Sequence, residues 1–176
     1  MTTFEIPTLT TARLRLRAFR AGDLDAYAAM QANPEVMRYL LTGRTSTRAE
    51  VWRTMATSLG AWALRGYGMW AMELKETGEF VGRAGLHQPE GWPDLELGWM
   101  LLPSQRRHGY ATEAARAALD YAFTHLHAPR LVSLIRIDNT ASERVARRLG
   151  GRQATTIDFL GGATLVYVYH PPETVG

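Results

Sequence analysis

The first part of the chain pairs an alternating segment with a short helical one. Residues 13–19 alternate apolar residues with three arginines, which predicts a half-buried strand whose arginines face solvent. Asp23 is expected to cap a short helix that follows this strand. The helix should end at Asn33-Pro34, because the residue before a proline disfavours the helical conformation.

The next part of the chain changes from helical spacing to strands. Thr47 and Glu50 have the spacing of a capping box, and apolar residues at helical period continue from there to a stop at Gly66. Three apolar, strand-like segments follow, separated by turn residues. They cover residues 69–75, 80–86 and 95–102.

The second half of the chain predicts two further helices and three further strands. Thr140 and Glu143 repeat the capping-box spacing at the start of the second helix, and Gly150-Gly151 ends it. Gly161-Gly162 lies between two strands and predicts a hairpin. In order, the elements are a helix at 110–126, a nearly continuous apolar strand at 131–137, a helix at 140–149, and strands at 155–160 and 164–169.

The order of elements is therefore β-α-α-β-β-β-α-β-α-β-β. A meander of strands followed by βαβ units predicts an α/β (α+β) fold, with a mixed, mostly antiparallel central sheet and helices on both faces. No repeat, low-complexity tract or long linker divides the chain. Its 176 residues suit one core, so we expect a single domain over residues 1–176.

Composition narrows the class of function. The chain has no cysteine, which excludes disulfides, thiolate metal sites and a covalent thiol intermediate. It lacks a long apolar run and a signal-peptide pattern, so we expect a cytoplasmic protein without membrane contact. The net charge of +3 suits a small anionic ligand at least as well as nucleic acid, and no direct nucleic-acid binding is expected. His125 and His127 lack a third ligand, so no metal is expected.

The segment Gln105-Arg106-Arg107-His108-Gly109-Tyr110-Ala111 stands directly before the predicted helix at 110–126. The first N–H groups of a helix have no internal partners, and the helix dipole favours an anion there. Gly109 lets the backbone approach a ligand closely, while the neighbouring basic side chains add positive charge. The sequence therefore predicts a phosphate-binding loop.

The predicted strand at 95–102 carries the candidate chemistry. Glu96, Gly98 and Met100 share one face, because side chains alternate along a strand. A carboxylate beside a missing side chain leaves room for a ligand next to a potential base. Alternatively, Glu96 is only the polar position of a half-exposed strand.

These segments together resemble a known family. Arg106-x-x-Gly109-x-Ala111 matches the acetyl-coenzyme A signature of the GNAT superfamily of N-acetyltransferases. The runs Glu96-Leu97-Gly98-Trp99, Gly109-Tyr110-Ala111-Thr112-Glu113-Ala114 and Asn139-Thr140-Ala141-Ser142, the last ending at Leu149-Gly150, resemble the RimJ/RimL-like branch of ribosomal-protein alanine N-acetyltransferases. The resemblance covers roughly residues 9–170.

The resemblance implies acetyl-coenzyme A as co-substrate, with its diphosphate held by backbone N–H groups of residues 107–111. The pantetheine arm would lie between the strand of Glu96 and the strand at 131–137, which splay apart. Asn139 resembles the family asparagine that contacts the coenzyme, or alternatively caps its helix. The expected cofactor-binding residues are Met100, Leu101, Arg106, Arg107, His108, Gly109, Tyr110, Ala111, Thr112 and Asn139.

The implied reaction is direct attack of a primary amine on the thioester in a ternary complex. Glu96 is the candidate base, through water, and is expected to be ionised like an ordinary glutamate of pKa about 4.3. A free α-amine is roughly a quarter neutral at pH 7.4 but a lysine only about a thousandth. An N-terminal α-amine of a protein or peptide is therefore the expected acceptor. The alternatives are a small amine (antibiotic, polyamine or amino acid) and a non-catalytic acyl-coenzyme A-binding module. Either a monomer or a homodimer is expected.

One position departs from the wider superfamily. Ala146 stands where many members carry a tyrosine that protonates the leaving thiolate. Ser142 lies one helical turn earlier and is the expected catalytic partner of Glu96, or alternatively a plain first-turn residue. The loop at 33–46 is expected to cover the acceptor site, and His87 is either a pocket residue or a loop histidine without a role. The expected acceptor-pocket residues are Tyr39, Trp70, His87 and Tyr167.

Overall fold

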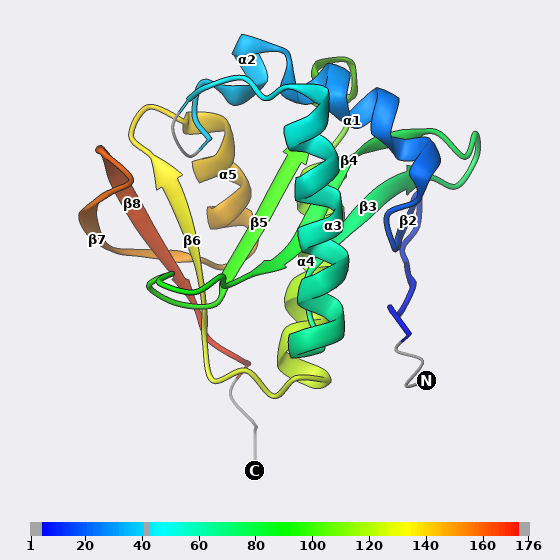
Figure 1. Ribbon diagram of the computed structural model, residues 1–176. Coiled ribbons are helices and arrows are strands. Elements are labelled where there is room, and N and C mark those ends of the chain that lie inside the picture. Colours follow the sequence, from blue (N-terminus) through cyan, green and yellow to red (C-terminus); the bar gives the residue numbers. More distant parts are fainter. Residues whose placement is uncertain (1–4, 41–42, 173–176) are drawn as a thin grey trace.

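The computed structural model describes residues 5–40 and 43–172 and contains one eight-stranded sheet (Figure 1). The strand order is β1-β2-β3-β4-β5-β6-β8-β7, and β5 and β6 form the parallel pair between otherwise antiparallel neighbours. The strands are β1 (Leu9–Thr10), β2 (Leu14–Arg17), β3 (Met69–Leu74), β4 (Phe80–His87), β5 (Glu96–Leu101), β6 (Leu131–Arg136), β7 (Arg152–Phe159) and β8 (Gly162–Tyr169). The helices are α1 (Leu24–Gln31), α2 (Pro34–Met37), α3 (Arg48–Arg65), α4 (Tyr110–Thr124) and α5 (Thr140–Arg148), with short 3₁₀ turns at Ala21–Asp23 and Pro103–Gln105.

Helices cover both faces of the sheet, and each face has its own apolar cluster. In Figure 1, α3 crosses in front of the sheet and α4 lies behind it. Tyr27 of α1 and Val51 of α3 pack with Met100 of β5 on one side. The alanines of α4, including Ala118, pack with Leu97 of β5 on the other, because small side chains let a helix approach a sheet closely. The predicted mixed fold with helices on both faces is confirmed.

The predicted boundaries of α3 are confirmed by its end groups. The Thr47 hydroxyl accepts the N–H of Glu50, and the Glu50 carboxylate accepts the N–H of Thr47. Gly66 ends the helix in the left-handed conformation, with φ of 72°. For α5 the predicted capping residue was wrong by one position. Asn139, rather than Thr140, is the N-cap, and its side-chain oxygen accepts the N–H of Ser142 at 3.2 Å, which confirms the alternative interpretation of Asn139 as a helix cap.

The prediction that the three arginines of residues 13–19 face solvent was wrong for Arg17, at the end of β2. Its side chain is 4% exposed. The guanidinium donates two hydrogen bonds of 2.8 Å to the Asp23 carboxylate and one of 2.5 Å to Glu73. Arg15 also pairs with Glu73, but 41% of its side chain is exposed. Two buried carboxylates therefore draw Arg17 inside.

Asp23 has a different role from the predicted helix cap. Its side chain makes no capping bond to α1 and instead accepts from Arg17 and from the N–H of Arg20, at 2.7 Å. Asp23 thereby ties the 3₁₀ turn before α1 to the sheet.

Two short elements, β1 and α2, were not predicted from the sequence pattern. Asn33 caps α2 by accepting the N–H of Glu35.

The parallel strands β5 and β6 diverge. They share a single register pair, Glu96 with Val132, whereas β4 and β5 share six. Two further bonds hold the narrow end: the N–H of Val132 donates to Leu95 at 3.0 Å, and the Ser133 hydroxyl donates to the carbonyl of Leu97 at 2.6 Å. Beyond these contacts β5 and β6 are no longer paired, and a wedge opens between them.

Candidate active site

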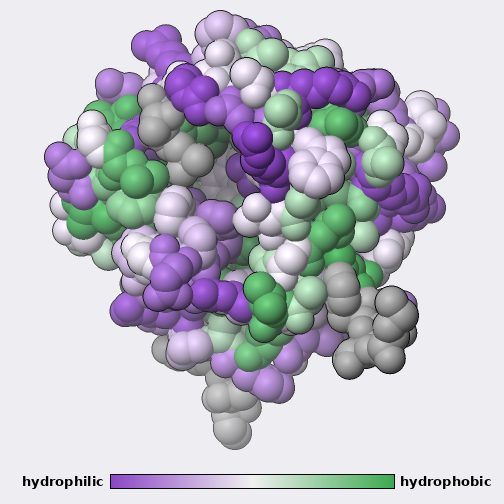
Figure 2. Space-filling model, in the orientation of Figure 1, coloured by the Kyte–Doolittle hydropathy of each residue, from purple (hydrophilic) through white to green (hydrophobic). Residues whose placement is uncertain are grey.

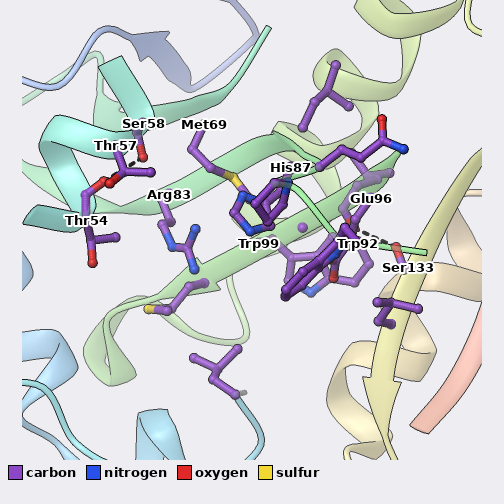
Figure 3. A pocket seen from close by; sticks show the side chains of 18 of the residues that line it. Thr54, Thr57, Ser58, Met69, Arg83, His87, Trp92, Glu96, Trp99 and Ser133 are labelled. Carbon is purple, nitrogen blue, oxygen red and sulfur yellow. Dashed lines mark hydrogen bonds between the residues drawn. The ribbon is translucent and has the colours of Figure 1, made fainter. Parts of the chain in front are cut away.

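A cavity of about 690 Å³ lies between α3 and the sheet and extends along the open wedge between β5 and β6. It opens on the face shown in Figure 2, where the surface is hollowed beside α3. Figure 3 shows that α3 contributes hydroxyl side chains and that β4, β5 and β6 contribute the remaining polar groups. These polar residues include Thr54, Thr57, Ser58, Arg83, His87, Glu96, Ser133, Asn139 and Ser142.

The floor of the cavity is the face of β4 and β5 that looks toward α3. Register pairs Arg83 with Met100, then Gly85 with Gly98, then His87 with Glu96. The glycine pair leaves the middle of this row without side chains. A Cβ atom at Gly98 would lie 3.1 Å from the methyl group of Met69, which therefore fills part of the room that the sequence predicted there.

Glu96 lies partly buried at one end of this row. The indole N–H of Trp92 donates to its Oε2 at 2.7 Å. Burial raises the pKa of Glu96 to about 7, against weaker opposing effects from Trp92, the N–H of Leu134 and the charge of Arg83. The expectation of an ordinary, fully ionised glutamate was wrong, because burial of the carboxyl group disfavours its charged form.

His87 stands opposite Glu96 and is shifted in the other direction. Burial and the charge of Arg83 lower the pKa of His87 to about 4. Its ring meets the Trp92 ring edge-on at 4.9 Å between centroids. The imidazole is therefore neutral at pH 7, and Glu96 is the group in this pair whose pKa lies near physiological pH. A base works best when its pKa lies near the working pH, which favours Glu96 over His87.

Two residues that sequence reasoning missed shape this end of the cavity. Trp92 touches Glu96 and His87 and meets the ring of Phe159 at 4.8 Å. Arg83 projects into the cavity from the middle of β4 (Figure 3). The sequence contained a feature that could have pointed to each of them. Arg83 is the lone charge inside an apolar strand, and Trp92 precedes the candidate base by four residues.

The far end of the cavity is formed by the start of α5. Asn139 and Ser142 both line it, and both are partly exposed. The structure thus brings Glu96 and Ser142 to one cavity, although they are 46 positions apart in the sequence. Met100 and Tyr39 also line it. In the loop at 33–46, residues 41 and 42 lie outside the described residues.

Two residues predicted for the acceptor pocket lie elsewhere. Trp70 is 0% exposed, donates its indole N–H to the carbonyl of Pro7 at 2.7 Å and packs beneath α4. Tyr167 is 1% exposed and donates its hydroxyl to Glu143 at 2.9 Å. Both predictions were wrong because the side chains point into the core on the α4 and α5 face of the sheet.

The loop before α4 presents a row of backbone donors. In the hydrogen bonding of the described residues, the N–H groups of residues 107–112 have no acceptor. Arg107 and Gly109 adopt left-handed conformations, with φ of 67° and 84°. Arg13 fixes the loop by donating to the carbonyl of His108 at 2.8 Å and pairing with Glu113 at 2.8 Å. Such a row of free donors at a helix N-terminus suits a phosphate group.

The remaining predicted residues surround this loop. Arg106 pairs with Glu35 of α2, and Arg107 and His108 are exposed. The ring of Tyr110 lies under the Arg13 guanidinium at 4.7 Å. Leu101 packs against the α4 cluster, on the opposite face of β5 from Met100.

The described residues contain neither a candidate metal-binding cluster nor a candidate membrane-spanning helix. Within residues 5–40 and 43–172, no three histidine or acidic side chains gather in a way that would hold a metal ion. None of the helices in that same part of the chain has the length and apolar character needed to cross a bilayer.

Comparisons with known proteins agree with one another. A family model described as an acetyltransferase (GNAT) domain matches residues 13–152. The Bacillus subtilis protein YkkB is 35% identical over 157 residues, which cover 85% of this chain and 87% of YkkB. A crystal structure of an acetyltransferase from Agrobacterium tumefaciens has a TM-score of 0.83 at 35% identity, covering 97% of this chain and 98% of that one. The fold is also shared with RimL, a ribosomal L7/L12 alpha-N-protein acetyltransferase in complex with coenzyme A, with a TM-score of 0.79 at 19% identity over 93% of this chain and 98% of RimL.

Proposed function

Because the chain belongs to the GNAT acetyltransferase family, and is thus an acetyl-coenzyme A-dependent N-acetyltransferase, we propose that its acceptor is a free α-amine such as the N-terminus of a protein or peptide. The observation that carries this proposal is the pKa of about 7 for Glu96. Moving a proton to it from an α-amine of pKa near 8 is uphill by about one unit, but from a lysine of pKa about 10.4 by more than three units. The site is therefore matched to the less basic amine.

In this proposal the free N–H groups of residues 107–112 hold the coenzyme diphosphate, since they fit an anion without a buried counter-charge. Arg106 and Arg107 stand beside them. The wedge between β5 and β6 leads from that loop toward Glu96, with Met100 and Asn139 on its walls. When bound, acetyl-coenzyme A supplies an activated acetyl thioester.

The chain's own residues then move protons. Glu96 accepts the proton of the incoming ammonium on its carboxylate, directly or through a water, while Trp92 holds Oε2 in place. Ser142 carries a hydroxyl proton in the lining of the same cavity and is the proposed acid. The absence of cysteine leaves direct attack in a ternary complex as the route.

The size of the cavity favours a second candidate, a small amine. About 690 Å³ is in the range of pockets that bury a small ligand. A screen by thiol release, followed by mass spectrometry of the products, separates the candidates. Short peptides with a free N-terminus should be acetylated there, whereas N-blocked peptides that retain a lysine should not. Turnover of small amines alone, without any peptide, would establish the second candidate.

Coenzyme binding should stabilise the fold. At a hundredfold excess over its dissociation constant, acetyl-coenzyme A is expected to add about 2.7 kcal/mol to the free energy of unfolding. For a chain of this size that raises the melting temperature by about 5–10 °C. Desulfo- and dephospho-coenzyme A should act similarly, because the diphosphate is the main anchor. No shift at millimolar coenzyme would contradict the proposed loop site.

Gly109→Val should weaken coenzyme binding more than it lowers stability. Valine strains the left-handed conformation by roughly 1–3 kcal/mol, and its Cβ would lie 3.4 Å from the Arg13 guanidinium, which holds the loop that carries the proposed diphosphate donors. The matched control is Gly78→Val, which imposes similar strain at φ of 74° in an open turn between β3 and β4. Both variants should lose similar melting temperature, and only Gly109→Val should lose coenzyme affinity by calorimetry. Equal affinities in the two variants would assign Gly109 a structural role alone.

A further inference from the structure

Arg83 is a cation without a partner inside the cavity. The described residues give its guanidinium no hydrogen bond and no ion pair, and its Nε atom is buried without a partner. In Figure 3 the side chain extends from β4 in the part of the cavity that Thr54, Thr57 and Ser58 of α3 also line. A buried charge normally has a partner, because leaving it unpaired costs free energy. The partner is therefore to be sought in a ligand.

The charges around the cavity point to an anionic partner. Glu96 contributes the one carboxylate of the described cavity lining, and burial keeps it partly protonated at neutral pH. The cations of the lining are more numerous, even though Arg44 is paired with Glu50 and Arg65 with Glu90. They are Arg44, Arg53, Arg65, Arg83 and Arg136. A polycationic acceptor such as a polyamine would meet repulsion here, and an acceptor carrying a carboxylate would not.

The register of the sheet sets how far that carboxylate lies from the amine. Arg83 faces Met100, four residues along β5 from Glu96, which is about 13 Å of strand. Between them lies the row at Gly85 and Gly98, which carries no side chains. An α-carboxylate stands only two bonds from its own amine and is too close to span this row. A carboxylate on the first or second side chain of a peptide reaches further.

We propose that Arg83 binds an acidic side chain of the acceptor, so that the enzyme acetylates α-amines that are closely followed by aspartate or glutamate. This inference rests on the α-amine function proposed above. The guanidinium offers paired N–H donors to the carboxylate, and the bond forms in a partly enclosed cavity, where charge-assisted bonds are stronger than on an open surface. Thr57 adds a hydroxyl on the facing helix.

The test compares matched peptides on the intact 176-residue chain. Peptides that begin Ser-Glu, Ser-Gln and Ser-Lys are assayed for kcat/KM, and binding of their N-acetylated products is measured by tryptophan fluorescence. We expect the glutamate peptide to exceed the glutamine peptide by about 10- to 100-fold, the value of one charge-assisted bond. The lysine peptide should be poorer still. Free glutamate should be a weak acceptor, because its amine and side-chain carboxylate lack the extra residue.

Variants then assign the preference to Arg83. Arg83→Gln should erase the difference between the glutamate and glutamine peptides, and Arg83→Glu should favour the lysine peptide. Arg152→Gln removes an exposed charge from the outer strand β7, and it should leave the preference intact. Equal kcat/KM for the three peptides on the wild type overturns the inference while leaving the α-amine function standing. No acetylation of any peptide overturns both.

Discussion

Glu96→Gln is expected to lower kcat by about 10²- to 10⁴-fold, the usual contribution of a positioned proton acceptor. Glutamine has nearly the same shape, and its amide oxygen still accepts the bond from Trp92, so the cavity should keep its form. Coenzyme affinity, measured by calorimetry, should stay within a few-fold of the wild type, because the diphosphate loop is distant from the change. An unchanged kcat for every accepted amine would contradict the role of Glu96.

The pH profile gives this prediction a second readout. In the wild type, kcat/KM should rise with pH through about 7 as Glu96 loses its proton and becomes a base. Glu96→Gln should lack that limb, and its deficit should shrink at high pH, where the amine arrives already neutral. Asp94→Asn is the matched control, because it removes a carboxylate that pairs with Arg130 outside the cavity. It should leave both kcat and the profile unchanged.

Arg17→Met is expected to lower the free energy of unfolding by about 3–5 kcal/mol, which corresponds to a drop in melting temperature of about 10–15 °C. The variant keeps the volume of the side chain but removes the buried guanidinium that joins Asp23 to Glu73, so Asp23 loses its salt-bridge partner and Glu73 keeps only the more exposed Arg15 and Arg20. The cost is the desolvation of these charges more than the loss of the bonds themselves. Chemical denaturation at pH 7 measures it directly.

A second arginine on the same strand is the control. Arg15→Met removes another partner of Glu73, but 41% of that side chain is exposed, so the loss should stay below about 1 kcal/mol.

The pH dependence of stability follows from Glu73. Burial alone would raise its pKa, but hydrogen bonds from Arg17 and Arg15 outweigh burial and hold the pKa below its usual value. Stability from this group is therefore present at neutral pH and lost in acid, so the deficit of Arg17→Met should shrink as the pH falls. An equal loss in both variants would contradict the network.

Local patterns were enough for most of the fold. A capping box and a glycine stop are properties of four or five neighbouring residues, which is why the ends of α3 were found from Thr47 and Gly66. Alternation likewise placed Leu14 and Leu16 in the core. The row of free backbone donors before α4 could be predicted for the same reason, since these donors and Gly109 are consecutive in the chain.

Features that depend on residues far away in the sequence could not be predicted from local patterns. Arg13, Arg15 and Arg17 occupy equivalent positions in the alternation, and the bond to Asp23 distinguishes the buried Arg17 from Arg15, which also pairs with Glu73. The pKa of Glu96 depends in the same way on Trp92 and β6, which meet it only in three dimensions. Trp70 and Tyr167 were misplaced because residue type alone does not say which face of a strand adjoins the cavity.

The wedge between β5 and β6 has a mechanical consequence. The register pair and the two bonds beside it join two parts of the sheet, β1–β5 and β6–β8. Glu96 lies at this junction. Its raised pKa comes from burial there, so a substitution that opens the junction to water should lower that pKa toward the value of an ordinary glutamate. The strength of the proposed base is thus set by how tightly the two parts of the sheet meet.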